Sequence, residues 1–428
     1  MFEEGIGSRE QTERLKNALG RRRRKLENAL DGQHPRNEAK YYAHLYPAKL
    51  ICQWLAYGKK PNDYLARREF AFIFENDAHH RYQTFTLAAD LQTALSRRVP
   101  HKIDFGAVYN AQPKDYKSTP DFRPQERELV FDIDLTDYDD VRGCCREATV
   151  CQQCWKFIVL AAKILNVVLR NHFGYRHMLW IFSGRRGMHC WVADEGARRL
   201  ENNDRSAVAA YLSFRLNELP YDAEFVHPYA ADVRPEINEL VVEQGWLTDE
   251  RLREALHKYC KDEPTRDFIQ QAMRGDEPKT RWRLLKTLCD EATYRAELER
   301  PRGPKPPEIT DERIHFLRTF VLDRLNPRLD SNVTTATNHL LKSPFCVHPK
   351  TGLVAVPFDV ERAADFRIDE VPRVDLLVAE LDQKTKDGEL KGRRRSGEPA
   401  RLSVPYKHTA LAPWIRVFEA FIKDLGSN

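Results

Sequence analysis

Apolar residues in the first quarter of the chain follow a helical period and then an extended one. From Tyr41 to Tyr57, aromatic and aliphatic residues recur at helical spacing, and Gly58 supplies a stop. Short strand-like runs follow at Phe70–Phe74 and Ile103–Tyr109. This pattern predicts one helix followed by short strands.

The next segments predict the order strand, helix, strand, strand. Leu129–Leu135 is apolar apart from two aspartates, which suits a buried strand. Trp155–Leu169 is strongly apolar at helical spacing. Met178–Phe182 and His189–Val192 are typical of two strands that flank a short loop at Ser183–Gly187.

The remainder of the chain is mostly helical in pattern. Residues 197–298 are charged and helix-like, Pro301–Pro307 predicts a stiff connector, and helices are expected at Asp311–Leu325 and Tyr406–Leu425. We therefore expect a charged N-terminal tail at 1–38, a core formed by 39–198 and 308–428, a helical subdomain or insertion with its connector at 199–307, and a disordered basic loop at 384–400.

Composition adds only broad limits. The 428 residues are 42% apolar and 31% charged, as in soluble globular proteins, and the net charge of +5 does not by itself establish nucleic-acid binding. The first 28 residues lack the apolar core of a signal peptide, and we expect no membrane-spanning segment and an intracellular protein. The basic run Arg21–Lys25 fits a nuclear-localisation or DNA-contacting tract, although a solvated helix face is the simpler interpretation.

Two aspartates in the Leu129–Leu135 strand carry the first candidate chemistry. Asp132 and Asp134 stand at i and i+2, so their side chains point to the same face. Adjacent carboxylates repel one another unless a cation lies between them. Polymerases and nucleases use such sites to hold two metal ions about 3.5–4 Å apart, one at the attacking hydroxyl and one at the triphosphate. The pair therefore predicts a divalent-metal site, which normally needs a third carboxylate.

Other families also use an Asp-x-Asp pattern. An EF-hand is excluded because the count from Asp132 places Asp137 at the glycine position and Gly143 at the glutamate position. The Gly-Ser turn expected in polymerase-beta-like nucleotidyltransferases is missing. A haloacid-dehalogenase-like phosphatase, with Asp132 as nucleophile and Asp134 as general acid, stays open as the alternative, although its downstream Gly-Asp-x-x-x-Asp element is not found.

Four of the nine cysteines fall within eleven residues: Cys144, Cys145, Cys151 and Cys154. Four thiolates are the complement of a closed, structural zinc site, and the Cys-x-x-Cys half has the usual spacing. Adjacent cysteines in the other half are unusual, and buried apolar cysteines or a redox pair are the alternatives. We expect a zinc motif over 144–154 that pins the loop after the aspartate strand.

A short loop and a later polar segment offer anion-binding groups. Ser183, Arg185, Arg186 and His189 surround a glycine-containing loop that suits a triphosphate, although an ordinary charged hairpin tip fits as well. It is not a Walker loop. Between residues 328 and 350, Asp330 is the candidate third carboxylate, and Lys342 and His348 are candidate phosphate contacts; a surface loop explains them equally well.

Taken together, these segments resemble the catalytic small subunit of archaeo-eukaryotic DNA primases, in its eukaryotic form. The resemblance covers most of residues 41–195 and 325–425 and is weak at 200–320. Besides the four cysteines, the matching segments are Tyr41–Pro47, Arg68–Phe70, Arg81–Gln83, Lys102–Tyr109, Glu128–Arg142, Trp180–Val192, Pro327–Asp330, Asn338–Gly352 and Leu411–Trp414.

The resemblance implies an α+β fold: a mixed-sheet primase core with an RRM-like module, the structural zinc motif and a small helical subdomain. It implies two catalytic Mg²⁺ or Mn²⁺ ions and one structural Zn²⁺. The implied roles are metal binding for Asp132, Asp134 and Asp330, zinc binding for the four cysteines, triphosphate contacts for Ser183, Arg185, Arg186, His189, Lys342 and His348, and a nucleotide or primer lining for Glu69 (counted as catalytic), Arg81, Asp104, Asn332 and His339.

The implied function is synthesis of short RNA primers on single-stranded DNA from ribonucleoside triphosphates, in the nucleus. The implied partners are the iron–sulfur large primase subunit and the catalytic and accessory subunits of DNA polymerase alpha, without a membrane. A third hypothesis is a zinc-containing nucleic-acid-binding module that lacks catalysis.

Overall fold

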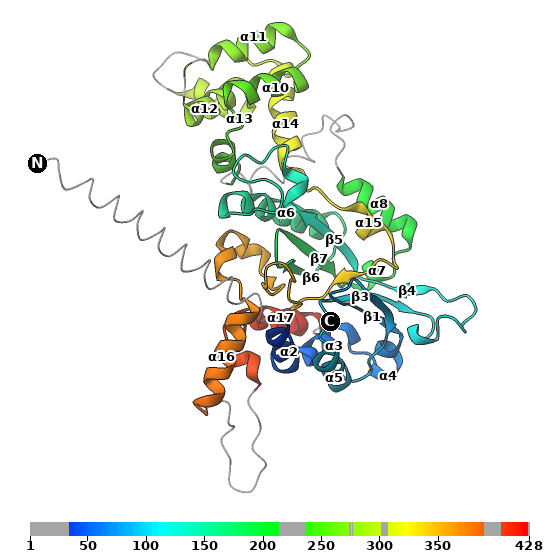
Figure 1. Ribbon diagram of the computed structural model, residues 1–428. Helices are drawn as coiled ribbons and strands as arrows, with labels where there is room; N and C mark the ends of the chain where they lie inside the picture. Colours follow the sequence, from blue (N-terminus) through cyan, green and yellow to red (C-terminus); the bar gives the residue numbers. More distant parts are fainter. Residues whose placement is uncertain are drawn as a thin grey trace, which may run out of the picture.

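The computed structural model describes residues 34–213, 236–273, 275, 277–300, 307–388 and 404–426. The basic run at 21–25, nearly all of the expected tail, the prolines at 301–306 and most of the basic loop at 384–400 lie outside these residues. The fold is a mixed α+β arrangement with two antiparallel sheets and a group of helices at one end (Figure 1).

The first sheet contains the early strands of the chain. Its order is β2–β1–β3–β4, where β1 is Arg68–Ile73, β2 His79–Gln83, β3 Lys102–Tyr109 and β4 Pro124–Glu126. All six residues of β1 are buried, as its apolar run predicts. The late strand β8 (Leu341–Lys342) pairs with β3 and brings the C-terminal part of the chain into this sheet.

The second sheet holds the two aspartates. Its order is β5–β7–β6–β9, where β5 is Leu129–Asp134, β6 Met178–Phe182, β7 Gly187–Val192 and β9 Pro357–Phe358. Between β5 and β6 lies α6 (Gln152–Asn171), and β6 and β7 form the predicted hairpin. Asp132 is in register with His189, and Asp134 with Gly187.

Helices from both ends of the chain close the core. The single helix predicted from Tyr41 to Tyr57 was wrong: α2 (His34–His44) and α3 (Ala48–Ala56) are separate helices. Pro47 lacks the amide hydrogen that a continuous helix needs, which explains the break. Trp54 of α3 packs against Phe105 of the first sheet, Trp191 of the second and Phe418 of α17 (Ala412–Leu425).

Most of the helix group at the top of Figure 1 comes from the charged middle of the chain. Its helices are α10 (Asp249–Tyr259), α11 (Glu263–Ala272), α12 (Pro278–Cys289), α13 (Glu291–Glu299) and α14 (Asp311–Leu325). Helix α14 packs against α10 and α12 as well as α6. The other helices are α4 (Pro61–Tyr64), α5 (Ala88–Arg98), α7 (Glu195–Arg198), α8 (Asn202–Leu212), α15 (Ser331–Thr335) and α16 (Val374–Lys386).

Helix α6 corrects one expectation from the sequence. It is long and apolar enough to cross a membrane, which we had not expected of any segment of the chain. In the fold, 72% of the apolar window of α6 is buried, and the core helix of a soluble protein satisfies the same criteria of length and composition. The apolar character of α6 is therefore weak grounds for a membrane span.

Candidate active site

The carboxylates of Asp132 and Asp134 lie on one face of β5, as the strand period predicts. Both side chains are about one-third exposed. The Asp134 carboxylate accepts hydrogen bonds from the amide and hydroxyl of Thr136, both at 3.0 Å, and from Nε of Arg186 at 2.6 Å. Asp132 has a different neighbour: its Oδ1 lies 3.7 Å from Nε2 of His189.

Asp330 is brought beside the pair by main-chain contacts. Its amide donates to the carbonyl of Asp132 at 3.0 Å, and the neighbouring Leu329 forms an isolated bridge with Ile133. In addition, the Thr334 hydroxyl donates to the carbonyl of Val130 at 2.8 Å. These contacts hold the start of α15 along β5, so the carboxylate that the sequence could only suggest belongs to the same site.

The site has the electrostatics of a cation-binding centre. Burial, followed by the charges of Asp134 and Asp330, raises the pKa of Asp132 to about 7. Oxygen donors of this kind suit Mg²⁺ and Mn²⁺, so the three side chains fit such ions chemically. Asp137 is a further carboxylate of this centre that the sequence analysis did not single out. Burial, followed by the charges of Asp134 and Asp330, raises its pKa. Its position three residues after Asp134 was the available signal.

The loop between β6 and β7 lies against the segment that follows β8. Nζ of Lys342 donates to the carbonyl of Ser183 at 2.6 Å, and the Thr351 hydroxyl donates to the carbonyl of Gly184 at 2.7 Å. Gly184 has φ +89°, and a Cβ there would stand 2.9 Å from Cβ of His348. Glycine is therefore required for this approach. One cluster is therefore formed by the β6–β7 loop together with Lys342 and His348, which the sequence predicted as separate groups.

The two histidines of this cluster are neutral, and its charged side chains (Arg185, Arg186 and Lys342) are all basic. Burial, followed by the charges of Lys342 and Arg185, lowers the pKa of His348 to about 3. Burial, then Lys342, lowers the pKa of His189 to about 3 as well, and its buried Nδ1 has no hydrogen-bond partner within the described residues. Lys342 and Arg185 both act on His348, and a polyanion would find both cations there.

The remaining predicted residues lie around this centre. Asp104 pairs in register with Lys342 across β3 and β8, and burial raises the pKa of its carboxyl. The fully buried Glu69 binds Nε of Arg81 at 2.8 Å and accepts from the Tyr109 hydroxyl at 3.1 Å. Glu69 thus fixes Arg81, which donates onward to the carbonyl of Asn338 at 3.3 Å.

Two predicted residues and one missed residue complete the surroundings. Asn332 is exposed, and its amide donates to the Asp330 carboxylate at 3.1 Å. Burial and then the charge of Arg127 lower the pKa of the half-buried His339. Arg127 itself is buried and also lowers the pKa of Asp104. Sequence reasoning missed Arg127, because an arginine beside a strand carries no distinguishing pattern.

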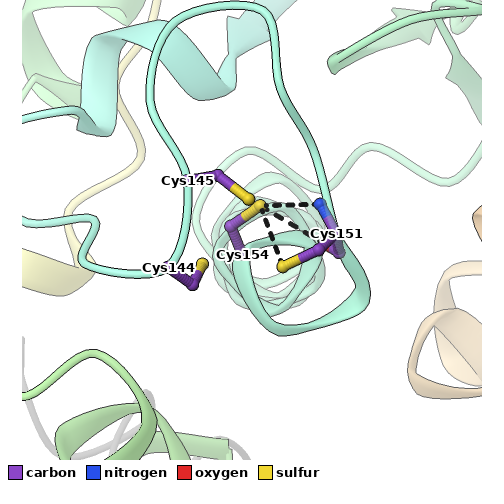
Figure 2. Close-up of side chains that lie close together, drawn as sticks. All are labelled: Cys144, Cys145, Cys151 and Cys154. Atoms are coloured by element: carbon purple, nitrogen blue, oxygen red, sulfur yellow. Dashed lines mark hydrogen bonds between the residues drawn. The ribbon is translucent and has the colours of Figure 1, made fainter. Parts of the chain in front are cut away.

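The four cysteines form a second, separate cluster (Figure 2). Their sulfur atoms all lie within 4.8 Å of one another. Nε2 of Gln244 lies 3.5 Å from Sγ of Cys144, and Nη1 of Arg142 lies 3.8 Å from Sγ of Cys154. Four thiols and these two donors fit a tetrahedral zinc site with an outer shell. Among the described residues, this is the one group of three or more potential ligands already close enough to hold an ion.

Comparison with known proteins places these features in one family. The model of the family described as DNA primase small subunit matches residues 131–360, which include the aspartates, the cysteines and the β6–β7 loop. A solved structure, "Polymerase Domain from Mycobacterium tuberculosis Ligase D in complex with DNA", reaches a TM-score of only 0.33 at 10% identity over 81% of this chain and 92% of its own, too low to establish a shared fold.

The relatives are similar over nearly their whole length. The DNA primase small subunit of Caenorhabditis elegans is 41% identical over 395 residues, 89% of this chain and 95% of the relative. That of Drosophila melanogaster is 37% identical (90% of each chain), and that of Saccharomyces cerevisiae 33% identical (91% of each). The chain therefore belongs to the DNA primase small subunit family, and its activity is that of a nucleotidyltransferase that makes RNA primers.

Proposed function

We propose that this chain joins ribonucleotides on a single-stranded DNA template at the site formed by β5, the β6–β7 loop and residues 330–348. The observation that carries the proposal is the hydrogen bond from the Asp330 amide to the Asp132 carbonyl, because it brings the third carboxylate to the pair. The Lys342 and Arg185 side chains supply positive charge for a triphosphate beside those carboxylates.

Asp132, Asp134 and Asp330 are proposed to hold two Mg²⁺ or Mn²⁺ ions. Bound there, such ions would lower the pKa of the attacking 3′-hydroxyl and would neutralise charge on the triphosphate. The protein contributes by orienting the reactants: it holds the 3′-hydroxyl near the α-phosphate, in line with the departing pyrophosphate. Because Arg186 already binds Asp134, it is placed to bridge that carboxylate and a phosphate oxygen.

The cationic groups of the β6–β7 loop and the 342–348 segment bind the triphosphate in this proposal. Arg185 and Lys342 contribute charge, whereas His189 and His348 contribute neutral imidazoles that donate or accept hydrogen bonds without adding charge. Ser183 offers a hydroxyl at the same loop. Arg81, fixed by Glu69, faces the nucleotide or primer region together with Asp104, Asn332 and His339.

The four cysteines are proposed to hold a structural Zn²⁺. The strands β5, β7 and β6 lie in that order, and α6 and a hairpin connect them along the chain, which supports the expected RRM-like module. Strand β9 pairs with β6 and forms the edge of the sheet opposite β5. Helices α10 to α13 support a helical subdomain within 199–307. The packing of α14 on α10 and α12 supports the inclusion of α14 in that subdomain, beyond the expected end at 307.

By family membership, the proposed partners are a large primase subunit, which is expected to carry an iron–sulfur cluster, and the DNA polymerase alpha subunits. The proposed location is the nucleus. The phosphatase alternative loses its basis, because the relatives and the family model are those of primases. A non-catalytic binding module is disfavoured because the three carboxylates and the cationic cluster share one site.

Primer synthesis on poly(dT) with ATP and Mg²⁺ or Mn²⁺ tests the proposal. We expect the wild type, alone or with a large subunit added, to make oligoriboadenylate. Asp134→Asn should make none while its zinc content and circular dichroism stay unchanged. Equal synthesis by Asp134→Asn would remove the two-metal mechanism, and no product from the wild type with the large subunit would remove the primase assignment.

A further inference from the structure

We propose that Tyr41, Tyr42 and Tyr46 are positioning residues of the triphosphate site. Their hydroxyls fix the five-residue loop Ser343–Val347, whose two flanking residues are Lys342 and His348. The inference rests on the proposed function of those two residues. The mechanism above does not use the three tyrosines.

Each hydroxyl reaches a different part of the loop. Tyr41 donates to the carbonyl of Phe345 at 2.8 Å, and Tyr46 shares a 2.8 Å hydrogen bond with the Ser343 hydroxyl. Tyr42 accepts from the amide of Val347 at 3.3 Å, and its oxygen lies 3.7 Å from Sγ of Cys346. The segments are about 300 residues apart in sequence, so the contact is tertiary and specific.

The three phenol groups are fully buried, so each hydroxyl needs a hydrogen-bond partner inside the protein. The exposed fractions of Tyr41, Tyr42 and Tyr46 are 0%, 0% and 1%. A phenylalanine would fill such a core without the cost of burying a hydroxyl, and a buried hydroxyl is tolerated when it has a partner. All four partner groups belong to the same short loop. Holding the loop is therefore the shared consequence of the three hydroxyls.

The loop has a conformation that needs to be held. Phe345 has φ +61°, in the left-handed region that a bulky residue rarely adopts. Its amide donates to the carbonyl of Ala355 at 2.6 Å, and its buried ring packs against Phe418 of α17 at 5.4 Å. The peptide after Phe345 is held by two bonds: the Tyr41 hydroxyl donates to the Phe345 carbonyl, and the Cys346 amide donates to the Ser343 carbonyl at 3.3 Å. Loss of the Tyr41 bond removes one of the two.

The loop geometry decides where the two flanking side chains point. Lys342 is held on one side by the β3–β8 pairing and donates to the carbonyl of Ser183. His348 is held on the other side by the bond from its amide to the carbonyl of Leu353 at 2.8 Å, and its Cβ approaches Gly184. A shift of the loop would move either group relative to the β6–β7 loop, where the triphosphate is proposed to bind.

The tyrosine segment is itself well anchored. Helix α2 packs between α5 and α16, and the side-chain amide of Gln92 on α5 donates to the carbonyl of Tyr42. Because Pro47 ends the helical path here, Tyr46 lies in the turn that leads to α3 and not on the helix. The break that separates α2 from α3 therefore lets three hydroxyls converge on one loop.

The test is a set of Tyr→Phe variants, which remove a hydroxyl and keep the ring. For Tyr46→Phe and the double variant Tyr41→Phe/Tyr46→Phe, we expect the KM for ATP on poly(dT) to rise about fivefold or more while kcat changes less than about twofold. The dissociation constant of a fluorescent ATP analogue should rise in parallel. Tyr64→Phe is the matched control, because it removes a phenol that donates to Glu126 at 2.6 Å, away from the loop.

Tyr64→Phe should lower the melting temperature comparably and leave the KM for ATP unchanged. The inference is overturned if the double variant keeps the wild-type KM and analogue affinity, or if Tyr64→Phe raises them equally. Failure of the proposed function would look different: the wild type would make no RNA. The analogue-binding arm does not need catalysis, so it still tests the role of the tyrosines in that case.

Discussion

The cysteine loop and the aspartate cluster are both sets of potential metal ligands, but the fold builds them in different ways. The cysteines come from eleven consecutive positions, and their sulfur atoms already lie within 4.8 Å of one another. The aspartates come from segments about 200 residues apart, and they are brought together by main-chain bonds between those segments and by the bond from the Thr334 hydroxyl to the Val130 carbonyl.

This difference matches the two proposed tasks. A closed site of four thiolates excludes substrate and stabilises structure. The carboxylates of Asp132, Asp134 and Asp330 repel one another, and Asp134 is turned to Arg186, so the site becomes complete when ions and a triphosphate supply positive charge and further ligands. A preassembled site therefore suits the proposed structural metal, and an electrostatically strained one suits the proposed catalytic metals.

The largest effect is expected from the third carboxylate. Asp330→Asn should lower the rate of nucleotide addition by about a thousandfold, because it removes a ligand of the proposed catalytic ions. Zinc content should not change. A suitable control is Asp359→Asn: Asp359 accepts an amide two residues ahead, from Glu361, as Asp330 does from Asn332. Equal loss of rate in both variants would assign the effect to helix capping and contradict the ligand role.

An intermediate effect is expected from pH on the aspartate site. Since the pKa of Asp132 is raised to about 7, an ion must displace a proton below that value, and apparent Mn²⁺ affinity should fall up to about tenfold per pH unit from 7 downward. The raised pKa also means that the metal-free fold loses stability as pH rises from about 4 to about 7. Titration calorimetry between pH 5.5 and 8 measures the affinity; a flat profile would contradict the assignment.

A smaller effect is expected at the outer shell of the cysteine site. The Gln244 side chain accepts from the amide of Gly143 at 2.7 Å and reaches Sγ of Cys144. Gln244→Ala should weaken zinc binding about tenfold, measured by competition with a chromogenic chelator, without changing the KM for ATP. Asn238→Ala is the control, because Asn238 binds Trp282 and not the cysteine loop. Unchanged zinc affinity in Gln244→Ala would show that the cysteines bind zinc without this support.

The same contrast separates what the sequence could predict from what it could not. The sequence could predict the cysteine cluster and the Asp132–Asp134 pair because their spacing alone places the side chains together. The predicted strands that carry the aspartates and the arginine loop were confirmed. Asp330 could be suggested as a third ligand but not placed, because its contact with Asp132 depends on a bridge between distant segments.

Other features also depended on tertiary context. The break at Pro47 was overlooked because the apolar period continues across it, although proline gave a usable signal. The roles of Tyr41, Tyr42 and Tyr46 could not be seen, because their partners lie about 300 residues away. The burial of Arg127 and the neutral state of His189 follow from the packed environment and have no local pattern.

Direct measurement of Mn²⁺ binding tests the central claim most closely. The zinc-loaded protein would be titrated with Mn²⁺ in the presence of a non-hydrolysable ATP analogue, and free Mn²⁺ would be followed by electron paramagnetic resonance. We expect the two ions of a two-metal site in the wild type and the loss of at least one in Asp132→Asn and in Asp330→Asn. Wild-type stoichiometry and affinity in both variants would contradict it.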